Sequence, residues 1–307
     1  MPPTTHQEHG ATKARIMLVA LCLIWGMTWP VMRISLSEIP PLSFRVGTAM
    51  IGALTMCTLV ALQRRSFRIP NRTHWLHVAV AGILNVVGFS LFSAFAQIHA
   101  ATSRVAIIAY TMPIWTALLA RPILGERLNL ARGAGLALCI AGMTVLVYPL
   151  AGAGIPGGIL LALGCAMSWA AGTVYLKWAR IEGDPFALTA WQLVTAFIVI
   201  AFSVPLFEGG LHIWPARWQA LFGVVFTGLF GAGIAYYLWF ESVRRLPAMT
   251  AALGVLSVPA IGVASSALIL GERPTLTDLT GFVLIFAASA CVLLQPQAAA
   301  SVRAGTR

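Results

Sequence analysis

Ten stretches of about 20 mostly apolar residues fill nearly the whole chain, and they restrict its fold more than any other feature. A helix of about 20 residues crosses the roughly 30 Å hydrocarbon core of a bilayer, where every backbone polar group needs a partner within the protein. The stretches are continuously apolar and lack the alternation typical of barrel strands, so we predict transmembrane α-helices. The predicted spans are residues 16–36, 42–62, 76–95, 104–124, 131–149, 157–177, 186–206, 218–239, 247–270 and 279–295.

Little of the chain is left for a water-soluble domain. Hydrophobic residues make up 59% of the sequence and charged residues only 9%. Residues 1–14 are predicted to be a disordered polar tail, and residues 297–307 a second tail at the other end. The sequence therefore predicts an all-α integral membrane protein with ten transmembrane helices.

An internal repeat divides the ten spans into two halves. The string Ile-Leu-Gly-Glu-Arg occurs at residues 123–127 and again at residues 269–273, an offset of 146 residues. The same offset relates Pro113 to Pro259 and Gly135 to Gly281, so the similarity extends into the flanking helices. We therefore predict a duplicated unit, with repeat 1 at residues 15–149 and repeat 2 at residues 157–296.

Five helices per repeat is an odd number, so the second repeat must enter the membrane from the opposite side to the first. Lys and Arg favour the cytoplasmic side of short loops, and with the N-terminus inside, fifteen of the 20 lie on that side and four outside. The prediction is two inverted repeats with both termini cytoplasmic. Membrane insertion and anionic lipid then explain the net charge of +11 better than nucleic-acid binding does.

Paired motifs in the two halves resemble those of EamA-type ten-helix permeases, a family of the drug/metabolite transporter superfamily. They are Ile24-Trp25-Gly26 with Ser168-Trp169-Ala170, Phe44-Arg45 with Trp191-Gln192, and the two helices that end in Leu-Gly-Glu-Arg. The resemblance covers about residues 13–296. It implies a permease of the bacterial inner membrane, commonly an exporter of amino acids or other small metabolites. It also implies a central cavity lined by the first, third, fourth, sixth, eighth and ninth helices, without naming a substrate.

Two prolines are candidates for moving parts. Pro113 and Pro259 fall near the middle of their predicted spans, where a proline removes a backbone hydrogen bond and kinks the helix. Proline is frequent in membrane helices, but a symmetric pair favours a gate at the cavity. Tyr110 and Trp115 lie beside Pro113 and are candidate cavity residues. Tyr236, near the cytoplasmic end of the eighth span, is either an interfacial belt residue or part of an inner gate.

Aromatic and polar residues within the spans are the other candidates for solute contact. Trp25 and Trp169 lie away from the interfacial belt, and either pack between helices or face the cavity. Asn85 either lines the cavity or hydrogen-bonds a neighbouring helix. Arg45, about one turn inside the second span, is an interface anchor or a residue that attracts a substrate carboxylate. Gln192 is its uncharged counterpart in repeat 2.

The Gly-Glu-Arg ends are predicted to be structural: a glycine that stops the helix, followed by an interfacial ion pair. All nine acidic residues fall in termini, loops or helix ends. Small multidrug-resistance pumps of the same superfamily depend on a glutamate within their first helix, and the span at residues 16–36 contains none. Proton-coupled export by that mechanism is therefore disfavoured.

Several chemistries lack the residues that they need. The chain has no phosphate-binding glycine loop of the Walker type and no Cys-x-x-Cys pair among its five cysteines, so we predict no cofactor, no metal site and no catalytic residue. The favoured function is a secondary transporter of a small organic solute that works by alternating access. The alternative is a lipid-handling, scramblase-like protein or an intramembrane enzyme. The expected partners are the solute and membrane lipid, without nucleic acid, and the chain is expected to be a monomer or homodimer.

Overall fold

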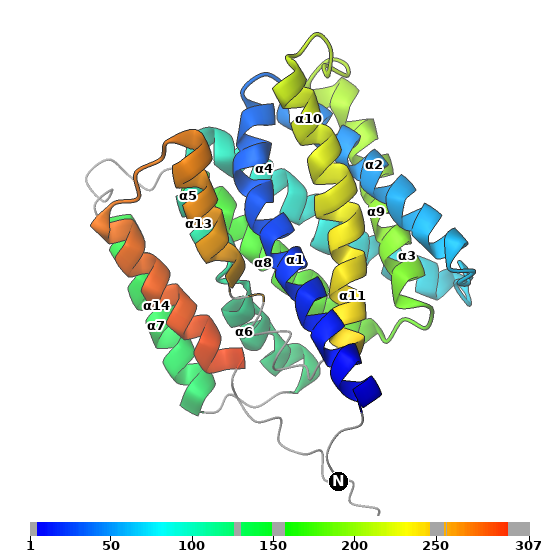
Figure 1. Ribbon diagram of the computed structural model, residues 1–307, viewed down its shortest axis with the longest axis horizontal. Coiled ribbons are helices and arrows are strands. Elements are labelled where there is room, and N and C mark those ends of the chain that lie inside the picture. Colours follow the sequence, from blue (N-terminus) through cyan, green and yellow to red (C-terminus); the bar gives the residue numbers. More distant parts are fainter. Residues whose placement is uncertain (1–4, 126–129, 149–156, 246–254, 256, 294–307) are drawn as a thin grey trace, which may run out of the picture.

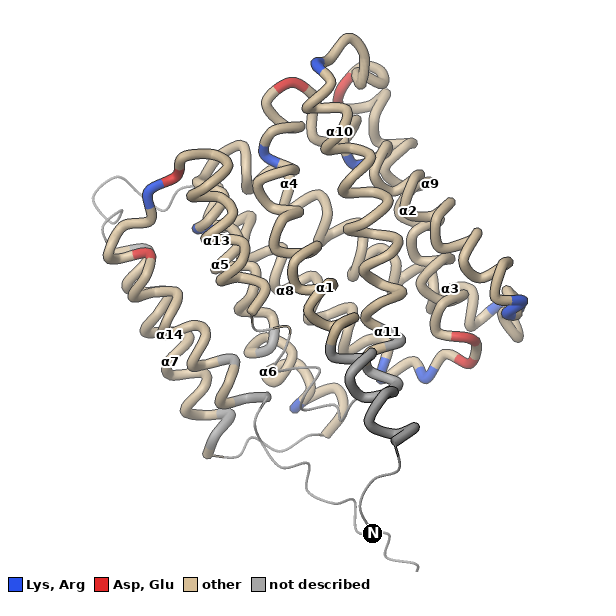
Figure 2. Tube along the Cα trace, in the orientation of Figure 1, with Lys and Arg blue, Asp and Glu red and all other residues tan. Residues whose placement is uncertain are grey.

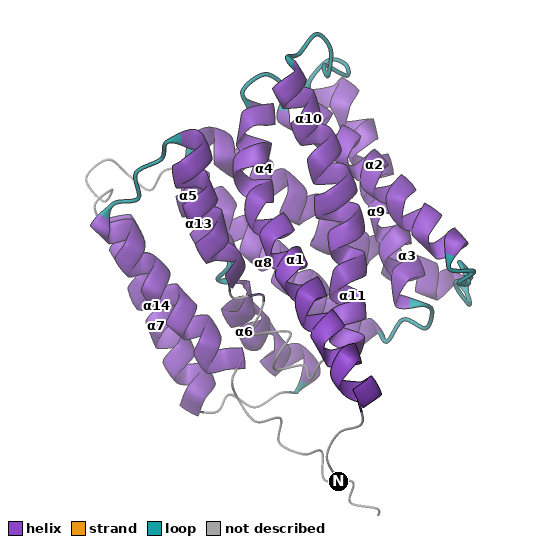
Figure 3. Cartoon of the chain, viewed as in Figure 1, coloured by secondary structure: helices purple, strands orange, loops and turns teal. Residues whose placement is uncertain are grey.

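A computed structural model describes residues 5–125, 130–148, 157–245, 255 and 257–293, and within them the regular elements are helices (Figures 1 and 3). The helices of repeat 1 are α1 (Thr5–Leu36), α2 (Pro41–Leu62), α3 (Arg72–Gly82), η1 (Ile83–Gly88), α4 (Phe89–His99), α5 (Thr102–Ala109), α6 (Met112–Leu124) and α7 (Leu130–Val147). Those of repeat 2 are α8 (Gly157–Ala179), α9 (Pro185–Phe207), α10 (Trp218–Phe226), η3 (Thr227–Ile234), α11 (Ala235–Arg245), α13 (Ser257–Leu270) and α14 (Leu276–Leu293).

The described helices account for the ten predicted membrane segments. Seven are long and apolar enough to cross a membrane alone, and three shorter apolar helices, at residues 133–146, 257–270 and 276–288, complete the set. The third span is continuous through α3, η1 and α4, and the eighth through α10, η3 and α11. The prediction of an all-α fold with ten transmembrane helices is therefore confirmed.

The N-terminal segment differs from the prediction of a disordered tail. Helix α1 begins at Thr5, so residues 5–14 are helical and precede the membrane span, which begins at Ile16. Extending an existing helix needs no new nucleus and adds one backbone hydrogen bond per residue, which lets a polar segment remain helical. The predicted C-terminal tail and the link around Pro156 lie outside the described residues.

The two repeats interleave, and the most extensive helix contacts join one to the other. Helix α2 packs on α9 and α7 on α14, while α1 packs on α13 and α11, and α8 on α4 and α6. Figure 1 shows the α7–α14 pair at one side of the molecule, beside a larger group that surrounds α1 and α8. The buried core is thus shared by both repeats, and each repeat supplies the packing partners of the other.

A short π-helix interrupts the third helix of each repeat. The offset of 146 residues that relates the repeated strings also maps residues 83–88 of η1 onto residues 229–234 of η3. A π-helix pairs backbone groups five residues apart, which leaves carbonyls available to outside donors. Trp25 Nε1 of α1 donates to the Gly231 carbonyl oxygen at 3.1 Å, and Ser168 Oγ of α8 donates to the Leu84 carbonyl oxygen at 2.6 Å. The first helix of each repeat therefore holds the π-helix of the other.

Charged residues gather in the loops at the two ends of the bundle (Figure 2). We call one end the Glu208 face, because it carries Glu38, Glu208 and Glu272. The other is the Lys177 face, which carries Lys177 and the basic loop at residues 64–72. On the Glu208 face, the carboxylate of Glu208 accepts hydrogen bonds from the backbone N–H groups of Leu42 and Ser43 at 2.7 and 2.9 Å. Repeat 2 thus supplies the cap at the N-terminus of α2.

The second Gly-Glu-Arg string ends one helix and caps another. Gly271 adopts a left-handed conformation, with φ of 68°, directly after α13. The carboxylate of Glu272 then accepts the backbone N–H groups of Thr102 and Ser103, at 2.7 and 2.9 Å. The predicted glycine stop is present, but Glu272 caps the N-terminus of α5, where exposed amides and the helix dipole favour an anion. In the first copy, residues 126 and 127 lie outside the described residues.

Candidate solute cavity

A cavity of about 620 Å³ lies between the two repeats. Its walls come from the first, third, fourth, sixth, eighth and ninth spans, as the family resemblance implied. The ninth span contributes Val255, which lies just before α13. The second helix adds Arg45, Thr48 and Ala49, and the seventh adds Leu193. Because both repeats contribute walls, a relative movement of the repeats would change the shape of the cavity.

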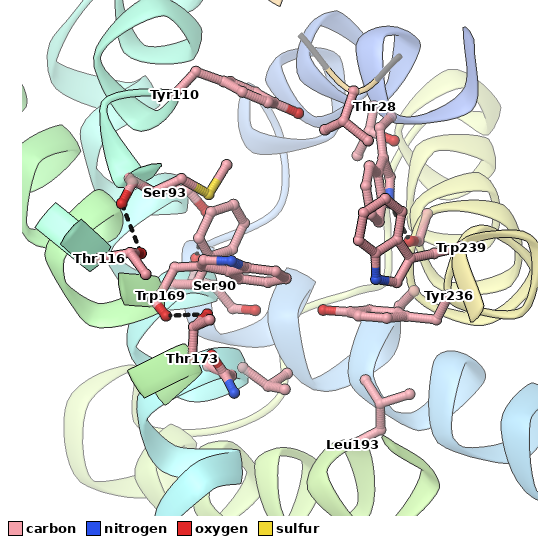
Figure 4. Close-up of a pocket in the computed structure, with 18 of the residues that line it drawn as sticks. Thr28, Ser90, Ser93, Tyr110, Thr116, Trp169, Thr173, Leu193, Tyr236 and Trp239 are labelled. Carbon is pink, nitrogen blue, oxygen red and sulfur yellow. Dashed lines mark hydrogen bonds between the residues drawn. The ribbon is translucent and has the colours of Figure 1, made fainter. Parts of the chain in front are cut away.

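Five aromatic side chains form one connected wall, which we call the aromatic wall: Trp25, Phe89, Trp169, Tyr236 and Trp239. Trp169 stacks on Tyr236 with ring centroids 6.4 Å apart and contacts Phe89 edge-on at 5.1 Å. Trp25 contacts Tyr236 edge-on at 6.1 Å and Trp239 at 6.2 Å. Figure 4 shows Trp169 and Tyr236 extending toward each other into the open space. Such rings offer faces for apolar, aromatic or cationic groups.

The polar groups of the cavity are few and mostly engaged by the protein. Thr28 Oγ1 donates to the Ile24 carbonyl oxygen at 2.8 Å, and Thr116 Oγ1 to that of Met112 at 2.8 Å. Asn85, in η1, donates from Nδ2 to Gln192 Oε1 at 3.3 Å, while its buried Oδ1 has no hydrogen-bond partner among the described residues. The Asn85 carboxamide oxygen is therefore an acceptor within the cavity wall.

Arg45 is a buried cation in the wall. It is only 7% exposed, and its Nη2 donates to Ser93 Oγ at 2.7 Å and lies 2.8 Å from Met32 Sδ. The guanidinium carbon lies 5.2 Å from the centroid of the Phe44 ring. The buried Nε has no hydrogen-bond partner in the described part of the chain.

The cavity is closed toward the Glu208 face and extends to the Lys177 face. At the closed end, the lining residues Trp29, Met32 and Ser93 are 5%, 2% and 0% exposed. At the other end, Thr173 and Lys177 of α8 line the cavity and are exposed. The structure therefore shows a one-sided cavity.

Six of the eight cavity candidates from the sequence lie around this space, namely Trp25, Arg45, Asn85, Tyr110, Trp169 and Tyr236. Trp115 and Gln192 are not in its lining. Trp115 Nε1 instead donates to Thr111 Oγ1 at 3.0 Å, and Gln192 Nε2 donates to the Leu188 carbonyl oxygen at 3.3 Å. Gln192 thus supports Asn85 from behind the wall.

Sequence reasoning missed two rings of the aromatic wall, Phe89 and Trp239. A signal was available, because Phe89 follows Asn85 by four residues and Trp239 follows Tyr236 by three. Residues at these spacings share one face of a helix. Ser93, which bonds Arg45, continues the same face four residues beyond Phe89.

Pro113 lies at a helix start and not at a mid-helix kink. The fourth span is broken at Tyr110 and Thr111, and Pro113 occupies the first turn of α6. Pro259 is buried in α13, and residues 246–254 and 256, which precede α13, lie outside the described residues. In a first turn, proline costs little, because the N–H that it lacks would have no partner within the helix. The predicted kink at Pro113 is therefore replaced by a break in the helix, and Tyr110 lines the cavity at that break.

Comparison with known proteins agrees with this architecture. The sequence matches the EamA-like transporter family twice, over residues 12–148 and 156–294, and the chain belongs to that family. It is 25% identical over 279 residues to the uncharacterized transporter YoaV of Bacillus subtilis, covering 89% of this chain and 94% of that one. A protein of Salmonella typhimurium named "Probable amino-acid metabolite efflux pump" is 24% identical over 285 residues, covering 90% and 93%. A solved crystal structure superimposes with a TM-score of 0.65 and 26% identity, covering 92% of this chain and 97% of that one.

The protein is thus a multi-pass membrane transporter of the drug/metabolite transporter superfamily and not an enzyme. The predicted class, two repeats of five helices, is the one that the family and the fold define.

Proposed function

We propose that the protein exports small organic solutes, such as amino acids, across the bacterial inner membrane by alternating access. The observation that carries this proposal is the one-sided cavity, whose walls come from both inverted repeats. An inverted pair can adopt a second arrangement in which the opposite end of the same cavity is open. The name of the Salmonella typhimurium relative supports an amino-acid metabolite as cargo.

In this proposal, the Lys177 face is cytoplasmic and the structure corresponds to an inward-open state. The excess of Lys and Arg on that side supports this orientation, because basic residues are retained in cytoplasmic loops. The break before Pro113 would be the place where the fourth span bends as the cavity changes sides. The relative from Escherichia coli named inner membrane transporter YedA supports the choice of membrane.

Cysteine labelling in intact cells tests the orientation. Ser37 and Ser66 are a matched pair, because both are exposed and they lie in the loops at opposite ends of α2. A membrane-impermeant thiol reagent is expected to label Ser37→Cys and to leave Ser66→Cys unmodified. The parent chain, whose five cysteines lie within helices, is the control. Labelling of Ser66→Cys alone would show the opposite orientation. Equal labelling of both variants would contradict the proposal that they lie on opposite sides of the membrane.

A transport assay in proteoliposomes tests the function. Counterflow is measured for a panel of amino acids, amines and purines, with Trp169→Leu as the cavity variant and Trp218→Leu as its control. Trp169 belongs to the aromatic wall, whereas Trp218 is 71% exposed at the start of α10. We expect Trp169→Leu to slow the transported solute about tenfold or more, as loss of about 1.4 kcal/mol of ring contact would do, and Trp218→Leu to leave it unchanged.

The same vesicles distinguish the lipid-handling alternative. If no solute moves faster than in empty vesicles while labelled lipid crosses the bilayer, the exporter proposal fails and a scramblase-like function takes its place. If solute movement is unaffected by Trp169→Leu, the cavity is not the route.

A further inference from the structure

Arg45 is the one charged group at the closed end of the cavity, among the residues that the structure describes. Its side chain is more than nine-tenths buried, and Nη2 contacts the neutral Ser93 hydroxyl and the Met32 thioether. The Nε atom is buried without a hydrogen-bond partner in the described residues. Arginine does not lose its charge in proteins, so this site keeps a cation with only neutral contacts around it.

Five of the described carboxylates bind other groups at or near helix ends. Glu208 and Glu272 cap the N-termini of α2 and α5, and Glu38 pairs with Arg217 at 2.8 Å. Asp184 pairs with Arg65 at 2.9 Å, and Asp278 with Arg104 at 2.7 Å. The lining of the cavity, as far as the structure describes it, contains no Asp or Glu. A buried charge is costly unless it is paired, so the site is short of one anion.

The positions of Phe89 and Ser93 along α4 give the separation between this cation and the aromatic wall. Phe89 contacts Trp169, and Ser93, four residues further along α4, accepts the hydrogen bond of Arg45. Four helical residues rise about 6 Å. The cavity therefore presents a guanidinium at its closed end and aromatic rings about 6 Å nearer to the open end.

We propose that Arg45 is the carboxylate-binding residue of the cavity, so that the cargo carries a carboxylate and, about 6 Å from it, an apolar or aromatic group. This inference rests on the proposed transport function. The planar guanidinium fork matches a carboxylate with two parallel hydrogen bonds, and Nε is one of the donors that the protein leaves unpaired. The counterpart in repeat 2 is the neutral Gln192, which bonds Asn85 and lies outside the lining, so the site has a single cationic anchor point for an anion.

Matched pairs of solutes test this assignment. The probes are L-phenylalanine and L-phenylalaninamide, L-leucine and L-leucinamide, and 3-phenylpropionate and 3-phenylpropanamide. Binding to the purified full chain is measured by tryptophan fluorescence, and counterflow is measured in proteoliposomes. At least one acid is expected to bind about tenfold or more tightly than its amide, the factor for one charge-assisted hydrogen bond.

Substitutions at Arg45 separate charge from geometry. Arg45→Gln introduces the residue type found in the other repeat. It is expected to weaken binding of the acid about tenfold or more and to leave binding of the amide unchanged. Arg45→Lys keeps the charge but lacks the planar fork, so its affinity for the acid should lie between those of the wild type and Arg45→Gln. Ser93→Ala removes the hydroxyl that bonds Arg45 at 2.7 Å but keeps Arg45 itself. It should weaken binding of the acid several-fold.

The outcomes are decisive in both directions. The assignment is overturned if Arg45→Gln, eluting as a monodisperse protein, keeps the preference for acid over amide, or if the wild type binds amides as well as acids or binds no acid. If Arg45→Gln does not fold, Ser93→Ala decides the matter: a several-fold smaller preference for acid over amide supports the assignment, and an unchanged preference overturns it. If acids bind in an Arg45-dependent way but nothing is transported, the transport proposal fails and the binding assignment stands.

Discussion

Replacing Gly172 by alanine tests the contact between α8 and η1, which joins the two repeats beside the cavity. A Cβ atom at Gly172 would lie 2.3 Å from Asn85 Oδ1 and 2.8 Å from the Asn85 backbone nitrogen. The Asn85 side chain can rotate away, but its backbone nitrogen cannot. It belongs to η1, whose Leu84 carbonyl oxygen is held by Ser168 at 2.6 Å. The glycine is therefore required for the close approach of two backbones.

The size of the effect follows from these distances. Ordinary van der Waals contact begins at 3.4 Å, so α8 and η1 must separate by about 0.6 Å to admit the methyl group. Overpacking of this kind costs about 1–3 kcal/mol, and the better helix propensity of alanine returns about 0.5–1 kcal/mol. The middle of each range leaves a net loss of about 1 kcal/mol in the free energy of unfolding, and the upper limit leaves about 2.5 kcal/mol. A loss of about 1 kcal/mol lowers the ratio of folded to unfolded protein about fivefold.

Reversible unfolding in mixed micelles, followed by circular dichroism against the fraction of denaturing detergent, measures this loss. Gly133→Ala is the control, because Gly133 is a helical glycine in α7 whose added Cβ meets nothing within 4 Å. It should be as stable as the wild type or more stable by about 0.5–1 kcal/mol. If Gly172→Ala unfolds at the same midpoint as Gly133→Ala, the close contact between α8 and η1 is refuted.

The remaining predictions concern hydrogen bonds between the repeats. Trp25→Phe keeps the ring but removes the N–H that bonds Gly231, and Ser168→Ala removes the hydroxyl that bonds Leu84; each should cost about 0.6–1.7 kcal/mol in the same unfolding assay. A double variant whose loss equals the sum would show that the two contacts act independently, and no loss in either would contradict their role. Glu272→Ala should lower stability by about 1–2 kcal/mol, because two amides of α5 lose a charged acceptor. Glutamine at position 272 should restore part of this loss by accepting one bond; a neutral result for alanine would argue against the cap.

Trp25 shows how one residue serves both structure and cavity. Its N–H holds the π-helix η3, while its ring contacts Tyr236 and Trp239 in the aromatic wall. The two interpretations that the sequence left open, packing and cavity lining, are therefore both present in the structure. Trp169 differs, because the neighbouring Ser168 makes the contact to η1 and leaves the Trp169 ring to the cavity.

The membrane segments and their duplication were predictable from the sequence alone. Hydrocarbon allows only spans whose backbone groups are satisfied internally, so length and composition define each helix locally. The repeated string related the two halves, and the odd number of helices in each made them inverted. Trp25, Asn85 and Tyr236 were identified as candidate cavity residues because aromatic and polar side chains stand out against an apolar background.

Only the tertiary structure decided which helices meet and what each polar group bonds. Apolar faces of similar composition pack with similar free energies, so one sequence does not show that α2 pairs with α9 or that α8 holds η1. The partner of Glu272 lies 170 residues away, and Trp115 lies outside the cavity lining with its N–H bonded to the Thr111 hydroxyl. Local composition determines the spans, whereas the site is made by contacts between residues far apart in the chain.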